Sequence, residues 1–222
     1  MRNFFNSDSR LMKVLAKLFD IGYLSILFIL FCIPIVTIGA ALTALYYTTV
    51  KVIRHDRGYV FHEFWHAFKL NFLPATKLWI VQAVLFILIA FNISLVNENV
   101  TTTSSFMLGA YIVIGVIIYA VSCYAYPVLS RFNMKNMQIL RMSLFMIAKH
   151  IIFTIPLVII SGAAVFLIVF LIPYLPVVPI LVPGLASLAY SYPMEIVLKK
   201  YMVQAKKNDD EDGEAVDEWY LE

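Results

Sequence analysis

Residues 151–194 read IIFTIPLVIISGAAVFLIVFLIPYLPVVPILVPGLASLAYSYPM, a run of 44 residues without a charge. The hydrocarbon core of a bilayer is about 30 Å thick, so a helix that crosses it needs about 20 residues. The run is therefore too long for one crossing and long enough for two. Prolines, which break helices, cluster in its middle: Pro173, Pro176, Pro179 and Pro183. This stretch predicts two membrane spans, about 151–172 and 180–198, joined as a hairpin.

The residues on either side of the run agree with a hairpin. Lys149 and His150 precede it, and Lys199 and Lys200 follow it. Loops on the cytoplasmic side of a membrane carry an excess of Lys and Arg. Both ends of the run are therefore expected on that side, which requires an even number of crossings.

A second charge-free run, residues 21–50, has the same arrangement. Basic residues lie on both sides of it: Arg10, Lys13, Lys17, then Lys51, Arg54 and Arg57. Pro34 and Gly39 near its middle permit a turn. We predict a tight hairpin of two short arms, about 16–33 and 36–53, although a re-entrant loop at 34–39 would give the same charge pattern.

Two further spans are expected at about 76–96 and 106–130. With them, all 17 Lys and Arg residues fall in four segments on one side of the membrane: 2–17, 51–77, 131–149 and 199–207. The three connections on the other side, near 34–35, 97–105 and 173–179, contain none. The sequence thus predicts an all-α, polytopic transmembrane helical bundle of about six spans, in the cell membrane, with both termini in the cytoplasm.

Composition supports lipid as the main solvent. Apolar residues make up 62% of the chain and charged residues 14%, whereas soluble domains carry about 25% charged residues. The mean hydropathy is +0.84. The net charge of +3 follows the expected topology, so we expect the lipid bilayer and no nucleic acid as a partner. We divide the chain into a transmembrane domain, 1–203, and an acidic, disordered cytoplasmic tail, 204–222.

Two of the basic connections have the pattern of amphipathic helices. Residues 59–72 place aromatic residues on one face: Phe61, Phe64, Trp65, Phe68 and Phe72. His62, His66 and Lys69 lie on the other face. Residues 136–149 repeat the pattern, with one apolar face formed by Leu140, Leu144 and Ile147. Such helices lie among lipid headgroups or pack under a bundle.

These connections supply the candidate contact residues of the chain. We expect the following side chains to contact anionic lipid or a protein partner: Arg54, Arg57, His62, Trp65, His66, Lys69 and Arg141. The order of a span, a basic turn, an amphipathic helix and a second span occurs at 36–96 and again at 106–172. It indicates either a weak internal duplication or the ordinary alternation of spans and basic loops.

One short motif is typical of an enzyme. Residues 62–66 match H-E-x-x-H, in which His62 and His66 would hold a zinc ion and Glu63 would polarise the attacking water. A catalytic zinc needs a third protein ligand, and the available candidates (Asp20, Asp56, His150 and Glu195) stand in no recognisable motif. A basic stripe on an interfacial helix explains the same residues. We therefore predict no metal, no cofactor and no catalytic residues.

Residues 34–72 resemble the YesL family of bacterial integral membrane proteins. The elements that carry the resemblance are Pro34, Thr37-Ile38-Gly39, the segment Leu42–Tyr47, Arg54, Gly58 and the aromatic helix that ends at Asn71-Phe72. Members of that family often accompany carbohydrate ABC transporters and polysaccharide-degrading enzymes in Gram-positive bacteria. The resemblance implies an accessory role in sugar uptake and carries over no catalytic residue.

Three functions are therefore considered. The first is a non-catalytic accessory or assembly subunit of a carbohydrate ABC importer, with the sugar permease subunits as partners. The second is a small transporter or channel that works alone. The third is a membrane zinc metalloprotease that uses His62, Glu63 and His66. The first is the prediction that the resemblance favours.

Overall fold

The computed structural model describes residues 10–97, 102–132, 134–171 and 178–209, and these are helical with no β-strand. The elements, in chain order, are α1 (Arg10–Cys32), a 3₁₀ helix η1 (Ile35–Thr37), α2 (Ile38–Thr48), a π-helical segment η2 (Thr49–Arg54), α3 (Val60–Asn97), α4 (Thr102–Arg131), α5 (Asn136–Lys149), α6 (Ile151–Leu171) and α7 (Val178–Asp209). Within these ranges, six helices are long and apolar enough to cross a membrane. The predicted all-α, multi-pass architecture is confirmed.

The short second arm of the first hairpin, α2 with η2, is the centre of the molecule. Two thirds (67%) of the apolar window Ile35–Arg54 is buried, compared with 6% of the window in α3. Its alanines and glycine allow close approach of neighbouring helices. A Cβ atom on Gly39 would lie 2.6 Å from the carbonyl oxygen of Ala75 and 2.7 Å from Cβ of Trp79, both on α3. The small residues of α2 therefore serve packing inside the bundle.

The turn at 33–37 forms a hairpin between two helices. α1 ends at Cys32, and Thr37 donates its hydroxyl to the carbonyl oxygens of Phe31 (2.5 Å) and Pro34 (2.7 Å). The second arm, Ile35–Arg54, is 20 residues long, about 30 Å, which is enough to span the hydrocarbon core. The two short arms expected from the sequence are both present.

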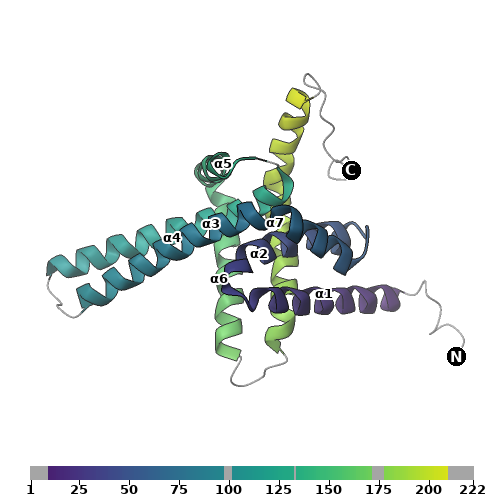
Figure 1. Ribbon diagram of the computed structural model, residues 1–222, viewed down its shortest axis with the longest axis horizontal. Coiled ribbons are helices and arrows are strands. Elements are labelled where there is room, and N and C mark those ends of the chain that lie inside the picture. The colour runs from purple at the N-terminus through teal and green to yellow at the C-terminus, as the bar shows by residue number, and fades with distance from the viewer. Residues whose placement is uncertain (1–9, 98–101, 133, 172–177, 210–222) are drawn as a thin grey trace, which may run out of the picture.

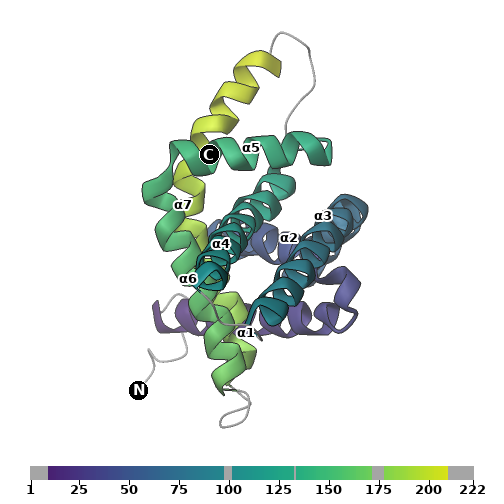
Figure 2. The same ribbon diagram turned by 90° about the vertical axis from the view of Figure 1, so that its left-hand side faces the viewer.

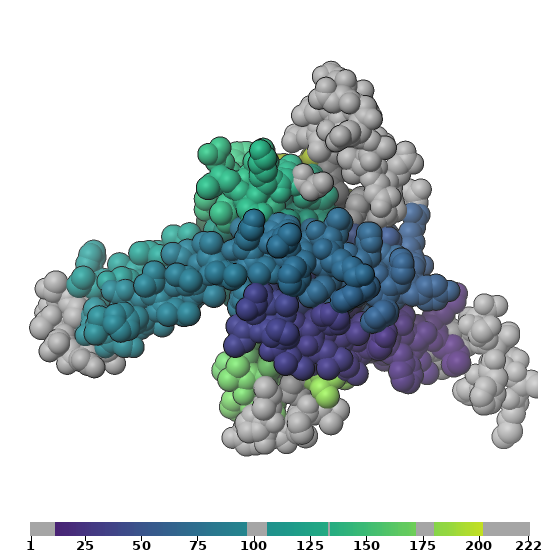
Figure 3. Space-filling model, in the orientation of Figure 1, coloured from purple at the N-terminus to yellow at the C-terminus, as the bar shows by residue number. Residues whose placement is uncertain are grey.

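The long hairpins diverge from the centre instead of running side by side. In Figure 1 the α3–α4 hairpin extends to the left, whereas α6 and α7 run vertically and are joined at the bottom. The view from the left in Figure 2 shows α3 and α4 end-on while α6 and α7 remain vertical. The space-filling view in Figure 3 shows the α3–α4 hairpin as an arm that projects from the rest of the molecule.

Despite this divergence, the helix ends separate into two groups. The start of α1 and the turn between η2 and α3 lie at the right in Figure 1, and α5 and the end of α7 lie at the top. These ends carry the Lys and Arg residues. The ends without Lys or Arg, at the tips of the two long hairpins, lie at the left and the bottom. In this view the basic ends therefore lie away from the tips of the two long hairpins.

α3 differs from the sequence prediction of a separate amphipathic helix at 59–72 and a span at 76–96. It is one continuous helix of 38 residues, with Pro74 inside it. Proline weakens a helix by removing one N–H donor, but tertiary contacts override this effect here. The buried face runs without interruption past the proline, through Phe64, Phe68, Ala75 and Leu78.

α5 is a separate amphipathic helix, as predicted, but its buried face is displaced by one residue. Ile139, Ser143 and Met146 are fully buried, whereas Leu144 is half exposed. Leu140 and Ile147 flank the buried face. Because α5 is separate from α6 while the corresponding part of α3 is fused to its span, the two proposed repeats differ in construction.

The predicted outer connections and the acidic tail lie largely outside the described residues. α6 ends at Leu171 and α7 begins at Val178, so Pro173 and Pro176 belong to the part that is not described. α7 continues to Asp209, beyond the boundary expected at residue 203. The remainder of the tail, 210–222, is not described, and its assignment stays a prediction.

Candidate functional site

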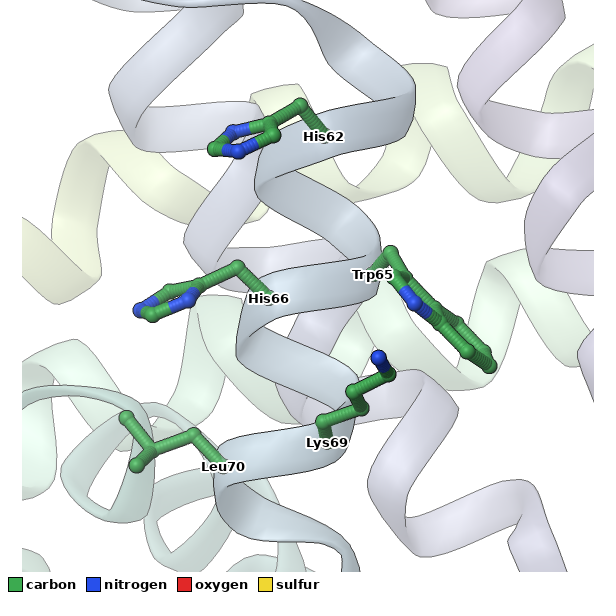
Figure 4. Close-up of a pocket in the computed structure, with 5 residues that line it drawn as sticks. All are labelled: His62, Trp65, His66, Lys69 and Leu70. Atoms are coloured by element: carbon green, nitrogen blue, oxygen red, sulfur yellow. The ribbon is translucent and has the colours of Figure 1, made fainter.

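The H-E-x-x-H segment lies in the first turns of α3, and Glu63 points away from the face that carries His62 and His66. His62 and His66 are exposed on the outer face of the helix (Figure 4). Glu63 is buried, and its Oε2 lies 2.8 Å from Nζ of Lys51 on η2. Its other oxygen, Oε1, lies 3.6 Å from Nδ1 of His62. The carboxylate is thus engaged in the bundle and is not placed beside a metal held by both imidazoles.

The third ligands considered from the sequence do not complete a zinc site. Asp56 pairs with Lys17 at 3.0 Å, His150 lies 3.1 Å from the hydroxyl of Tyr201, and Glu195 binds Arg131. In the ranges 10–97, 102–132, 134–171 and 178–209, no three His, Cys, Asp or Glu residues are grouped to hold a metal. The local geometry therefore does not fit the zinc-protease arrangement that the motif suggested.

The structure gives Glu63 a different role, in the turn between η2 and α3. Gly58 in that turn has φ +82°, a backbone conformation that residues other than glycine rarely adopt. A Cβ atom there would lie 2.6 Å from Oε1 of Glu63. Lys51, which also donates to the hydroxyl of Tyr47 (3.2 Å), holds the carboxylate against this turn. Gly58, Glu63 and Lys51 thus fix where α3 starts.

Four of the predicted contact residues come together on the outer face of α3. His62, Trp65, His66 and Lys69 line a shallow hollow with Leu70, which we call the α3 hollow (Figure 4). Nζ of Lys69 lies 4.7 Å from the centre of the Trp65 ring, a cation–π distance. Arg57 and Arg141 are exposed elsewhere, in the turn before α3 and on α5.

Arg54 is the exception, because its side chain is directed into the bundle. Its Nη1 donates to the carbonyl oxygen (2.9 Å) and the hydroxyl (3.3 Å) of Ser191 on α7. The guanidinium also lies 4.5 Å from the centre of the Tyr192 ring. Arg54 therefore connects η2 to α7, a contact that the sequence prediction of an outward role did not include.

A buried ionic cluster lies beside this contact and was missed by sequence reasoning. Nη2 of Arg131, the last residue of α4, lies 2.8 Å from Oε1 of Glu195 on α7, and the two side chains are only 1% and 5% exposed. The hydroxyl of Tyr46 on α2 donates to the same carboxylate oxygen at 2.6 Å. Three helices are thereby joined at one point. From the sequence, Glu195 was considered as a possible third zinc ligand.

A signal for this pair was present in the sequence. Arg131 directly follows one charge-free run, and Glu195 directly follows another. In the predicted topology both residues lie near the ends of their spans on the same side of the membrane, and their charges are opposite. Charges at the edge of the hydrocarbon are usually paired, so the two residues could have been matched.

Hydroxyl groups form two further hydrogen bonds between helices near this cluster. Thr49 bonds Ser187 at 2.8 Å, and Tyr124 bonds Thr154 at 2.9 Å. These bonds join η2 to α7 and α4 to α6. Because lipid offers no hydrogen-bond partner, such contacts between spans fix which helix faces meet.

Comparison with known proteins bears on the first part of this architecture. Residues 21–93 match the model of a family described as a protein of unknown function, DUF624. No curated protein and no solved structure matches the chain. The DUF624 match runs from α1 to near the end of α3, so it includes the α3 hollow, Gly58 and the Lys51–Glu63 pair. It ends before Arg131 and Glu195, and it assigns no activity to any residue.

The DUF624 match and the six apolar helices together support a multi-pass membrane protein of unknown function. Neither the match nor the helices identify a transported sugar.

Proposed function

We propose that the protein is a non-catalytic subunit of the bacterial cell membrane that assembles with the permease of a carbohydrate ABC importer. The class of partner comes from the resemblance to the YesL family. The proposal of a non-catalytic role is supported by the contacts that the buried acidic side chains make. Glu63 and Glu195, the buried acids of the described residues, are each ion-paired with a basic side chain that holds helices together.

The partner surface is proposed on α6, where small residues face outward. Gly162 has no atom within 4 Å of the position of a Cβ, unlike Gly39, which is closed against α3. Its neighbours along the exposed side of α6 include Ile159 and Phe166, which are 62% and 65% exposed. Small residues on a lipid-facing helix permit another helix to approach closely. Gly162 is therefore the centre of the proposed contact.

The orientation is part of the same proposal. The positive-inside rule assigns the basic helix ends at the right and top of Figure 1 to the cytoplasm. Both termini then lie inside, and α5 and the start of α3 face the side on which the nucleotide-binding subunits of an importer reside.

Co-purification from native membranes tests this proposal. A tagged chain extracted in mild detergent is expected to bring the sugar permease with it. Exchange of Gly162 for Leu is expected to abolish this recovery, whereas Gly109→Leu, at an equally open position on α4, is expected to retain it. Recovery of the wild-type chain alone would contradict the proposal.

A transporter or channel that works alone is the second candidate, and the buried Arg131–Glu195 pair favours it. Ionisable residues within spans are often part of a transport path. Flux of a labelled oligosaccharide into proteoliposomes that contain only this protein would establish that function. Loss of the flux in Glu195→Gln, at an unchanged amount of folded protein, would assign it to the pair.

A further inference from the structure

The exposed face of the first half of α3 combines basic side chains with large apolar side chains. His62, His66 and Lys69 are exposed there. Between and beside them lie Leu70 and Leu73, which are 68% and 67% exposed. Exposure of these leucines to water would be unfavourable, and so would burial of the Lys69 ammonium in hydrocarbon. The boundary between headgroups and acyl chains accommodates both kinds of side chain.

Within the described part of the chain, the basic side chains of this face have one acidic neighbour. Glu63 is the only acid between residues 60 and 97. Its carboxylate is buried and held by Lys51 at 2.8 Å, with His62 at 3.6 Å as its one neighbour on this face. His66 and Lys69 lie farther along the helix. The face therefore favours an anion from outside the chain.

The position of the α3 hollow along the helix corresponds to the headgroup layer. The charge-free part of α3 begins at Leu78, nine residues after Lys69, which is about 13 Å along the axis. α3 lies obliquely to the direction of α6 and α7, so its depth changes less than this distance. The headgroup layer is about 5–8 Å thick on each side of the core. Lys69 then reaches that layer, and Leu73 faces its inner edge.

From these three observations we infer that the α3 hollow binds the phosphate headgroup of an anionic phospholipid. Lys69 and the two imidazoles donate to the phosphate oxygens. The Trp65 ring, which lies 4.7 Å from Nζ of Lys69, holds the ammonium over the hollow (Figure 4). Leu70 and Leu73 contact the glycerol and the first acyl carbons. These apolar contacts distinguish a lipid from free phosphate.

Lipid retention measures this site directly. The protein is reconstituted in phosphatidylcholine nanodiscs with and without phosphatidylglycerol, and the lipids that remain bound after release are counted by native mass spectrometry. Phosphatidylglycerol is expected to be retained preferentially. Lys69→Gln is expected to weaken this retention about tenfold, as for loss of one charge-assisted hydrogen bond. Lys135→Gln, which removes an exposed cation that is not among the predicted contact residues, is expected to leave retention unchanged.

Three results would overturn the inference. The first is equal retention of phosphatidylcholine and phosphatidylglycerol by the wild type. The second is an equal loss of retention in Lys69→Gln and Lys135→Gln, which would indicate general surface charge. The third is thermal stabilisation of the lipid-free protein by inorganic phosphate as large as that by phosphatidylglycerol, which would assign the hollow to free phosphate.

Discussion

The hydroxyl of Tyr190 on α7 donates a hydrogen bond to the backbone carbonyl oxygen of Cys123 on α4. In a regular helix this carbonyl accepts the N–H of the residue four positions later. That residue is Pro127, which has no N–H. Tyr190 therefore satisfies an acceptor that proline leaves open, in a region where lipid offers no replacement. The same bond ties α7 to α4.

This relationship predicts coupling between positions 190 and 127. Tyr190→Phe is expected to lower the free energy of unfolding by about 1–3 kcal/mol, because a buried acceptor is left unsatisfied. In the Pro127→Ala background the helix supplies its own N–H, so the same exchange is expected to have a smaller effect. A double-mutant cycle of unfolding in detergent micelles measures the difference. Equal effects in the two backgrounds would show that Tyr190 does not serve this carbonyl.

The Arg131–Glu195 pair predicts that one exchange is more harmful than two. Arg131→Met leaves the buried carboxylate of Glu195 without its cation and is expected to destabilise the fold by about 3–5 kcal/mol. The double variant Arg131→Met, Glu195→Leu removes both charges and is expected to recover most of that loss. Thermal unfolding of the three proteins in one detergent compares them. A double variant no more stable than the single one would argue against a mainly structural pair.

Two glycines, Gly39 and Gly162, distinguish a helix face that is closely packed from one that is open. Gly39→Ala is expected to destabilise the fold, because the new methyl group would meet the backbone of α3 within 3 Å. Gly162→Ala is expected to leave the unfolding midpoint unchanged, since the surrounding space is open. Unfolding curves in detergent measure both. A Gly39→Ala protein as stable as the wild type would mean that α2 and α3 are farther apart than described.

His150 predicts a loss of stability at acid pH. Partial burial, together with the positive charges of Lys200 and Lys149, lowers the pKa of His150 below its ordinary value near 6.5. The unfolded chain then binds more protons than the folded one, so stability falls as pH decreases through and below that value. His150→Gln is expected to reduce the slope of unfolding midpoint against pH between about 7 and 5. An unchanged slope would remove His150 from this role.

The number of candidate spans could be predicted from the sequence, because it follows from the solvent. Runs without charge must be about a membrane thickness long, and basic residues mark one side. This reasoning did not predict the structure of α3. The sequence predicted an amphipathic helix at 59–72 and a separate span at 76–96, yet packing of Phe68, Ala75 and Leu78 along one face keeps the helix continuous.

The candidate site was predicted less completely, because contacts between distant residues decide it. Helical spacing predicted that His62, His66 and Lys69 share one face, but it placed Trp65 on the opposite face, whereas all four line the α3 hollow. Glu63 was considered only within the rejected zinc motif, and its pairing with Lys51 was not predicted because Lys51 lies on another element. Arg131 and Glu195 are 64 positions apart and meet only through the packing of α4 against α7.

The account depends most on the arrangement of the six spans, with all basic helix ends on one side of the membrane. Single cysteines at 69, 99 and 141, in a chain whose Cys32 and Cys123 are replaced by Ala, can be labelled with a membrane-impermeant maleimide. In intact cells, Asn99→Cys is expected to react, whereas Lys69→Cys and Arg141→Cys are expected to react only after permeabilisation. Reaction of Lys69→Cys or Arg141→Cys in intact cells would contradict the topology and the function built on it.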